Sequence, residues 1–185
     1  MQPPTLYLFA GSNGAGKSAF ARAYLTTGFE PLPRFLNADE IAGGLSPLAP
    51  DTVRLRAGKL LLREIRECLR GKASFAVEST LSGHSQASVI HQARALGFVI
   101  EIHYLWIPSA TLAICRIAQR VKKGGQAVPP EDVRRRYKRS LENFVHIYAP
   151  LADVWMIWDN TSEPTRLILR SSNATPVELK ALLHP

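Results

Sequence analysis

The feature that most constrains this chain is a glycine-rich segment that directly follows an apolar run. Residues 6–10 read LYLFA, and residues 11–18 read GSNGAGKS before the chain becomes apolar again. Glycine has no Cβ, so a loop rich in glycine can adopt unusual backbone angles and can approach a ligand closely. The segment therefore predicts a short strand, a tight loop and a helix that begins near residue 17.

The loop fits the pattern G-x-x-x-x-G-K-[ST] without a mismatch. Free N–H groups at a helix start, together with the positive end of the helix dipole, favour a bound anion. In this motif the backbone amides surround phosphates, the lysine reaches the β- and γ-phosphates, and the hydroxyl ligates Mg²⁺. We expect a nucleotide phosphate site made of Gly11, Ser12, Asn13, Gly14, Ala15, Gly16, Lys17 and Ser18.

The size and composition of the chain predict one globular domain that spans residues 1–185. The sequence has 185 residues, of which 46% are hydrophobic and 21% are charged, and both shares are ordinary. Cys68 and Cys115 are far apart, so they predict neither a metal site nor a disulfide framework, which favours the cytoplasm. No apolar run approaches the roughly 20 residues of a membrane helix, and the N-terminus lacks the pattern of a signal peptide.

The net charge of +8 allows two interpretations. The first is a nucleic-acid surface, and the second is a site for polyanionic small molecules on an otherwise solvated basic surface. The basic residues are spread over several expected helices, and aromatic residues are not interleaved with the dense run at residues 134–139. We therefore favour the small-molecule site.

Apolar segments of strand length alternate with helical patterns along the chain. Strands are expected at residues 6–10, 34–37, 74–79, 98–107 and 154–158, with an edge strand at 166–170. Helices are expected at residues 17–26, from 39, at 52–70 with Asp51 as the N-cap, at 85–96, 109–123, from 130, and at 176–183. The alternation predicts an α/β fold of the P-loop kinase-like kind, a mostly parallel sheet with helices on both faces.

Acidic residues follow three of the expected strands, at Asp39, Glu78 and Asp159. Ligands of parallel sheets bind at the carboxyl ends of the strands, so these acids are expected beside the phosphate loop. We assign Asp39 as the general base for an attacking hydroxyl, with a helix N-cap as its alternative role. Glu78 is assigned to Mg²⁺ or substrate, and the hydroxyls of Ser79 and Thr80 follow it. Asp159 is a weaker candidate, because Asp-Asn after a strand is common in turns.

Arginines flank a connection that reads GGQAVPP, at residues 124–130. Phosphoryl transfer requires cations near the transferring group, so a helical hairpin over about residues 109–150 is expected to act as a lid with arginines near its tip. The candidates are Arg120 before the connection, and Arg135 and Arg136 after it. A solvated basic face is the alternative, and helical phase alone does not decide which arginine of 134–136 reaches a phosphate.

These segments together resemble the zeta-toxin family of P-loop kinases, and in particular its short bacterial members. The matching segments are GSNGAGKS, NADEIA, FAVESTLSG, RVKKGGQAVPPEDVRRRYKRSLENF and WDNT, which follow in the order of the family between Leu6 and Thr161. The phosphate loop alone indicates nucleotide binding. Its combination with ESTLSG and the Gly-Gly-x-x-Val-Pro hairpin is more specific.

The resemblance implies a kinase that uses ATP and Mg²⁺ to phosphorylate a hydroxyl of a small molecule, in the family a UDP-activated amino sugar. It implies that Asp39 deprotonates that hydroxyl, that Glu78 and Thr80 line the acceptor pocket, and that the segment with Asn160 lies near the adenine. By the same resemblance, Lys17 holds the phosphates and Ser18 ligates the metal. The partner that the resemblance suggests is an antitoxin protein.

The chain also departs from the family pattern. Gln126 stands in the hairpin where many members have histidine, and the chain is shorter than the well-known toxins, so fewer elements of an acceptor pocket are expected. Two other functions stay open at this point. One is an ATPase or kinase that acts on nucleic acid, and the other is a nucleotide-binding regulatory module with little turnover.

Overall fold

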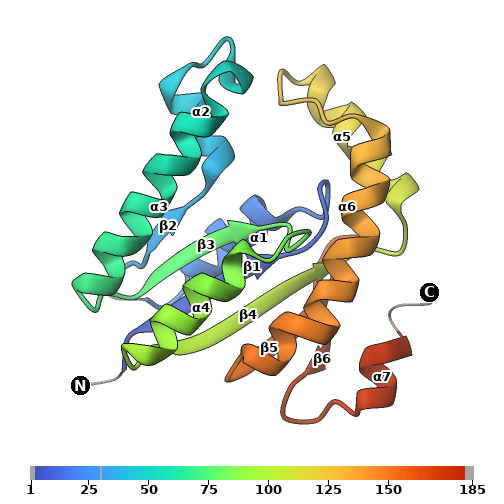
Figure 1. Ribbon diagram of the computed structural model, residues 1–185. Helices are drawn as coiled ribbons and strands as arrows, with labels where there is room; N and C mark the ends of the chain where they lie inside the picture. Colours follow the sequence, from blue (N-terminus) through green and yellow to red (C-terminus); the bar gives the residue numbers. More distant parts are fainter. Residues whose placement is uncertain (1–2, 30, 182–185) are drawn as a thin grey trace.

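The structure, a computed structural model, describes residues 3–29 and 31–181 (Figure 1). Its centre is a six-stranded sheet in the order β2-β3-β1-β4-β5-β6. The pairs among β1 to β5 are parallel, and β6 joins β5 in the antiparallel direction at one edge. The strands are β1 Thr5–Ala10, β2 Arg34–Leu36, β3 Phe75–Ser79, β4 Val99–Trp106, β5 Val154–Asp159 and β6 Arg166–Arg170.

Helices cover both faces of this sheet, because the strand residues alternate between two apolar clusters. On β1, Leu6 and Leu8 pack in the larger cluster with residues of α3 and α4, whereas Phe9 points to the opposite face and packs against α1. The helices are α1 Lys17–Leu25, α2 Ala38–Leu45, α3 Arg54–Arg70, α4 Ser85–Ala95, α5 Ala110–Lys122, α6 Pro130–Asn143 and α7 Pro176–Ala181.

The parallel sheet with helices on both faces and the edge strand at residues 166–170 confirm the fold expected from the sequence. The predicted start of the third helix, at residue 52 with Asp51 as its N-cap, was wrong. A 3₁₀ turn over Pro50–Val53 precedes α3, so Asp51 lies inside that turn instead of capping the helix. Its carboxylate forms an ion pair with Arg54 at 2.8 Å. Of the helix expected at residues 176–183, the last two positions lie outside the described residues.

Two helical projections rise beside the carboxyl ends of the strands (Figure 1). One is the α2–α3 arm, residues 38–70, and the other is the α5–α6 hairpin, residues 110–143. Their tips meet where Gln126 Nε2 donates a hydrogen bond to Asp51 Oδ1 at 2.6 Å. The P-loop lies below this contact, between the two projections (Figure 1). None of the helices in residues 3–29 and 31–181 combines the length and apolar character that crossing a membrane requires.

Candidate active site

The glycine-rich loop connects β1 to α1 and leaves the start of that helix open. Gly16 is the N-cap of α1 with a φ of 84°, and no side chain caps the helix. A Cβ at Gly16 would collide with the amide of Asn160, so only glycine fits this position. Among the described residues, the buried Ser12 Oγ and Asn13 Oδ1 have no hydrogen-bond partner. Uncapped N–H groups and the unpaired Ser12 hydroxyl, which can donate, fit a bound anion.

Asn160, in the loop after β5, holds the P-loop in this shape. Its Nδ2 donates to the carbonyl of Ala15 at 2.7 Å, and its Oδ1 accepts from Thr165 Oγ1 at 2.7 Å. Its backbone N–H also donates to the carbonyl of Trp106 at the end of β4. The resemblance implied a position near the adenine, which stays a prediction, and the structure shows a direct bond from Asn160 to the phosphate loop.

Glu78 connects three groups at the carboxyl ends of the strands. It lies near the end of β3, directly beside Phe9 of β1 in the parallel register. Its Oε2 accepts hydrogen bonds from Ser18 Oγ at 2.7 Å and from Asn37 Nδ2 at 2.9 Å. Its Oε1 lies 3.6 Å from Lys17 Nζ. The carboxylate therefore lies where the motif requires a metal ligand or an acid that supports one.

Lys17 is only 7% exposed and lies at the base of the loop. Its Nζ donates to the carbonyl of Ser12 at 3.0 Å. Burial lowers the pKa of Lys17 below its ordinary value, and the carboxylates of Glu78 and Asp39 oppose this shift without cancelling it. A buried ammonium that its neighbours do not fully compensate is well suited to a phosphate, which brings the missing negative charge.

Asp39 is exposed, and its carboxylate forms no hydrogen bond or ion pair with any other residue in 3–29 and 31–181. The N-cap of α2 is Asn37, whose Oδ1 accepts the N–H groups of Asp39 at 2.9 Å and Glu40 at 3.4 Å. The alternative role of Asp39 as the cap is therefore taken by its neighbour. Asn37 is a site residue that the sequence analysis missed. Its position directly after a strand and its cap-forming side chain were the available signals.

The two hydroxyl residues after Glu78 shape the connection between β3 and α4. Ser79 Oγ accepts from the N–H of Leu81 at 3.1 Å, and Thr80 Oγ1 lies 2.9 Å from Ser82 Oγ. Leu81 has a φ of 53°, and its carbonyl accepts from Asn143 Nδ2 at 2.7 Å. Ser79 and Thr80 therefore lie beside the site at the strand ends, but they do not line the cleft described next.

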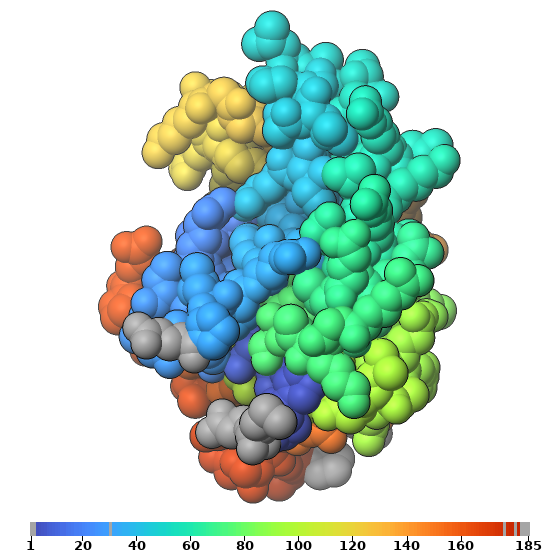
Figure 2. Space-filling view, turned by 90° about the vertical axis from the view of Figure 1, so that its left-hand side faces the viewer, coloured from blue at the N-terminus to red at the C-terminus, as the bar shows by residue number. Residues whose placement is uncertain are grey.

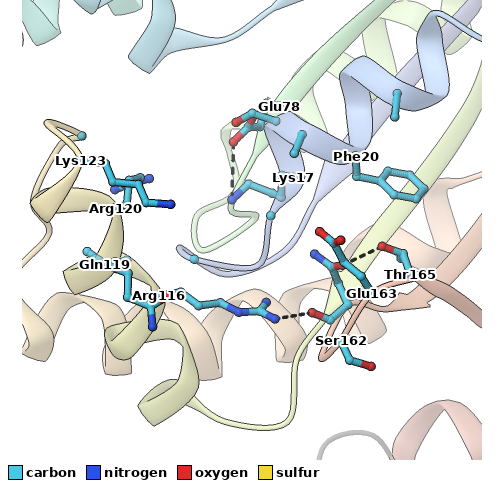
Figure 3. Close-up of a pocket in the computed structure, with 18 of the residues that line it drawn as sticks. Lys17, Phe20, Glu78, Arg116, Gln119, Arg120, Lys123, Ser162, Glu163 and Thr165 are labelled. Carbon is cyan, nitrogen blue, oxygen red and sulfur yellow. Dashed lines mark hydrogen bonds and ion pairs between the residues drawn. The ribbon is translucent and has the colours of Figure 1, made fainter.

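A cleft of about 1160 Å³ opens beside the P-loop (Figure 3). Figure 3 shows the side chains of α5 on one side of the cleft and those of the β5–β6 loop on the other. The lining includes four predicted site residues from the P-loop, together with Glu78, Arg120 and Asn160. The lining residues are Gly14, Gly16, Lys17, Ser18, Ala19, Phe20, Ala23, Glu78, Arg116, Ile117, Gln119, Arg120, Lys123, Gly125, Asn160, Ser162, Glu163, Pro164 and Thr165.

The predicted arginines are divided between two places. Arg120 lines the cleft, and its Nη2 donates to the carbonyl of Gln126 at 2.6 Å. Arg135 and Arg136 do not line it, and both pair with Asp132 of their own helix, at 2.5 and 3.5 Å. Arg136 is the more buried of the two, with 33% of its side chain exposed against 57% for Arg135.

Arg116 is a further cleft residue that the sequence analysis missed. Its Nη2 donates to the backbone carbonyls of Asn160 at 2.8 Å and Thr161 at 2.9 Å, and so joins α5 to the loop after β5. Its spacing was the available signal, since Arg116 precedes Arg120 by four residues and so lies on the same helix face.

A magnesium ion fits the donor set at the base of the loop. The Ser18 hydroxyl and the Glu78 carboxylate lie together, and oxygen donors of this kind are the ligands that Mg²⁺ prefers. In the described part of the chain, no group of three or more His, Cys, Asp or Glu side chains could hold a metal alone. Phosphate oxygens and waters would therefore complete the shell, as is usual for Mg²⁺.

The fold and the loop together define a P-loop protein of the kinase-like class. The model of the AAA domain family AAA_33 matches residues 6–144, which is most of the chain, so the chain belongs to that family. An uncharacterised protein of Haemophilus influenzae is 29% identical over 129 residues, which covers 70% of this chain and 89% of that protein.

Three solved structures have a similar fold at low sequence identity. A structure from the PezAT chromosomal toxin–antitoxin system of Streptococcus pneumoniae has a TM-score of 0.73 at 12% identity, with 98% of this chain and 78% of that chain covered. The AvrRxo1-ORF1:-ORF2 complex with ATP has a TM-score of 0.71 at 19% identity, with 97% of this chain and 63% of that chain covered. A gluconokinase from Sinorhizobium meliloti has a TM-score of 0.53 at 14% identity, with 98% of this chain and 91% of that chain covered. These likenesses support the fold.

Proposed function

We propose that this chain is a kinase that uses ATP and Mg²⁺ to phosphorylate a hydroxyl group of a small molecule. One observation carries the proposal. The buried Lys17 and the Ser18–Glu78 pair lie together at the carboxyl ends of β1 and β3, beside a cleft large enough for a nucleotide. The exposed Asp39 follows the neighbouring strand β2, and its charge acts on Lys17. A cation, a metal-ligand pair and a free carboxylate are the groups that phosphoryl transfer requires.

Each of these groups has one role in the proposed reaction. The P-loop amides and Lys17 hold the β- and γ-phosphates, and Ser18 with Glu78 would hold Mg²⁺, which neutralises charge on the phosphate oxygens. Asp39 accepts the proton of the acceptor hydroxyl as its oxygen attacks the γ-phosphorus, and the bond from that phosphorus to the β–γ bridging oxygen breaks to release ADP. Arg120 supplies positive charge to the transferring group after it leaves the carbonyl of Gln126.

The nucleotide base is proposed to lie at the end of the cleft that the β5–β6 loop lines, beside the bond from Arg116 to that loop. Phe20 and Pro164 line this end with apolar surface, and Ser162 and Thr165 add hydroxyls. The use of ATP is supported by the P-loop and by a protein of similar fold that is solved with ATP.

The acceptor is proposed to be a nucleotide-activated amino sugar, which rests on the resemblance to zeta toxins. The acceptor side lies at Asp39 and Glu78, with Thr80 beside them, and Arg135 and Arg136 would need to leave Asp132 to contribute there. A small-molecule kinase of this kind would work in the cytoplasm. An antitoxin protein as partner is supported by the similarity to a structure of a toxin–antitoxin system.

The assignment of Asp39 is tested by measuring phosphate transfer from ATP to a panel of hydroxyl metabolites that includes UDP-amino sugars. Asp39→Asn should lower kcat about 10²-fold or more, as loss of a general base does, and leave the Kd for ATP nearly unchanged. Glu40→Gln is the matched control, because Glu40 is the next residue and pairs with Arg22 on the surface. Full transfer by Asp39→Asn would show that another group is the base.

A further inference from the structure

The outer face of α3 carries a row of positive charge that is separate from the cleft. Arg56, Lys59, Arg63, Arg66 and Arg70 follow one another at intervals of three and four residues, so they form one line along the helix. At 1.5 Å per residue, the line is about 21 Å long. All five residues are exposed. We call these five residues the α3 stripe.

The stripe faces directly away from the core. The buried residues of α3 include Ala57, Leu61, Ile65 and Cys68, which occupy the opposite side of the helix. Figure 2 shows the face of the molecule on which α3 lies, and the helix runs along its surface without another described segment over it. The stripe is therefore available to a partner along its whole length.

This helix holds half of the net charge of the chain. It contains six basic and two acidic residues, a net +4, whereas the whole chain has +8. The two acids are engaged on its flank, where Glu64 and Glu67 approach Arg34 of β2 at 2.8 and 4.0 Å. The basic residues are spread over several helices, as the sequence indicated, but α3 carries six of the 23 and presents five of them in one exposed line.

Most of the stripe is not neutralised by the protein itself. Within residues 3–29 and 31–181, Arg63 pairs with Glu67 at 3.1 Å, and the other four stripe residues have no ion pair. The basic face of α6 differs, because its Arg135 and Arg136 pair with Asp132. Unpaired cations in a row are an electrostatic footprint for a polyanion.

The composition of the face indicates which polyanion fits. The stripe is bordered by Leu55, 76% exposed, and Leu62, 49% exposed, and the outer face of α3 has no aromatic residue. Proteins that bind single strands stack bases on aromatic rings, so this face lacks the means to hold unpaired bases. A regular row of cations instead matches a phosphate backbone, in which each strand of a duplex presents one charge per about 3.4 Å.

We infer that the α3 stripe is a docking surface for double-stranded nucleic acid, held through its phosphate backbone without base recognition. This inference goes beyond the proposed kinase and is independent of it. Four unpaired cations predict a slope of log affinity against log salt of about −3.6 for duplex DNA, which is about a 100-fold loss between 50 and 200 mM salt.

The test is fluorescence anisotropy of the full chain with labelled 20-base-pair DNA and RNA duplexes, from 50 to 200 mM KCl. Lys59→Gln with Arg66→Gln should reduce the slope by about 1.8, because two contacts are lost. The control is Lys138→Gln with Arg139→Gln on α6, which removes equal charge and should leave the slope unchanged. Excess ATP should not displace either duplex, since the stripe is outside the cleft.

Several results would overturn this inference. A flat salt response, or equal slopes for the Lys59/Arg66 variant and the wild type, would mean that the stripe binds no duplex. Tighter binding of the corresponding single strand would place the contact elsewhere. If polyglutamate displaces the duplex at equal charge concentration, an acidic polypeptide is the better partner. The DNA and RNA arms show which duplex is preferred, and circular dichroism confirms that each variant is folded.

Discussion

The nucleotide side and the acceptor side of the site are built in different ways. On the nucleotide side, each group is bonded to an element distant in the sequence: Ser18 donates to Glu78, and Asn160 donates to Ala15. On the acceptor side, Asp39 is exposed and Arg135 pairs with Asp132, three residues before it on the same helix. The nucleotide side is therefore tied to distant elements of the sheet, whereas Arg135 is tied within its own helix and can move with it.

This difference suggests the order in which the site is used. A pre-formed phosphate loop binds the nucleotide without rearrangement, so little free energy is lost in ordering it. The acceptor side has to be assembled, because Arg120 is bonded to the carbonyl of Gln126 and no described arginine of α6 lines the cleft. Closure of the α5–α6 hairpin over bound nucleotide would complete the catalytic group, as lids do in other enzymes.

The largest effect is expected on the pre-formed side, at Lys17. Lys17→Met removes the buried cation and should lower kcat/KM for phosphate transfer by about 10³-fold, within the range found for loss of a charge-stabilising donor. The folded state should survive, because burial of the charged lysine is itself unfavourable. Steady-state kinetics measures the loss, with Lys138→Met, 79% exposed on α6, as the control. Retention of full activity would remove the basis for the nucleotide side.

The next effect is expected at Asn160, which tests how the loop is held. Asn160→Ala leaves the carbonyl of Ala15 without its partner and removes the bond to Thr165. A lost buried hydrogen bond of this kind is worth about 1–2 kcal/mol, so the Kd for ATP should rise about tenfold. Isothermal titration calorimetry measures the Kd for ATP, and Asn173→Ala is the control because Asn173 is exposed. An unchanged Kd would indicate that the loop keeps its shape without Asn160.

The sequence predicted where the P-loop and Glu78 lie in the fold, because the signals for both are local. A strand, three glycines, a lysine and a serine occupy consecutive positions, and Glu78 stands at the end of an apolar strand, where a parallel sheet places it near the loop. The bond from Asn160 to Ala15 joins residues 145 positions apart. Only the packed fold brings these two together, so no local pattern could predict their contact.

The acceptor side was harder to predict because neighbouring residues compete for one role. Asn37 and Asp39 are both good helix caps, and the backbone places Asn37 at the cap. Asp51 also had the pattern of a cap, but Pro50 begins a 3₁₀ turn that displaces the helix start to Arg54. Arg135 is held by an ion pair with Asp132. The strength of this ion pair depends on how exposed the two side chains are, which the spacing of residues in the sequence does not give.

A smaller effect is expected beneath the nucleotide side, where Glu101 joins α1 to the sheet. Its Oε1 accepts from Tyr24 of α1 at 3.0 Å and lies 2.8 Å from His103 Nε2. Trp158 Nε1 donates to the other nitrogen of His103, so Nε2 carries the proton. Burial raises the pKa of Glu101, but the hydrogen bonds from His103 and Tyr24 outweigh it, and the pKa lies below its ordinary value.

The sign of the pH effect follows from this lowered pKa. Ionised Glu101 stabilises the folded state above the unfolded pKa of about 4.3, and this stability is lost as the pH falls through the folded pKa. Glu101→Gln should therefore reduce the free energy of unfolding at pH 7 by about 1 kcal/mol. Below about pH 5, the free energy of unfolding of the variant should decrease less steeply with falling pH than that of the wild type. Urea unfolding from pH 3 to 7 measures both. Glu142→Gln on α6 is the control, and a variant curve parallel to the wild type would contradict the assignment.

The smallest effect is expected where the two projections touch. Gln126→Ala removes the hydrogen bond from Nε2 to Asp51, but Asp51 is exposed and Gln126 only half-buried, so the contact is worth about 0.5 kcal/mol. The α2–α3 arm and the α5–α6 hairpin should separate more often, and kcat/KM should fall no more than about threefold. Spin labels at residues 48 and 127 would measure the spread of tip distances, with and without nucleotide. A loss above tenfold would mean that the acceptor side is already assembled through this contact, and the contrast between a fixed side and a mobile side would fail.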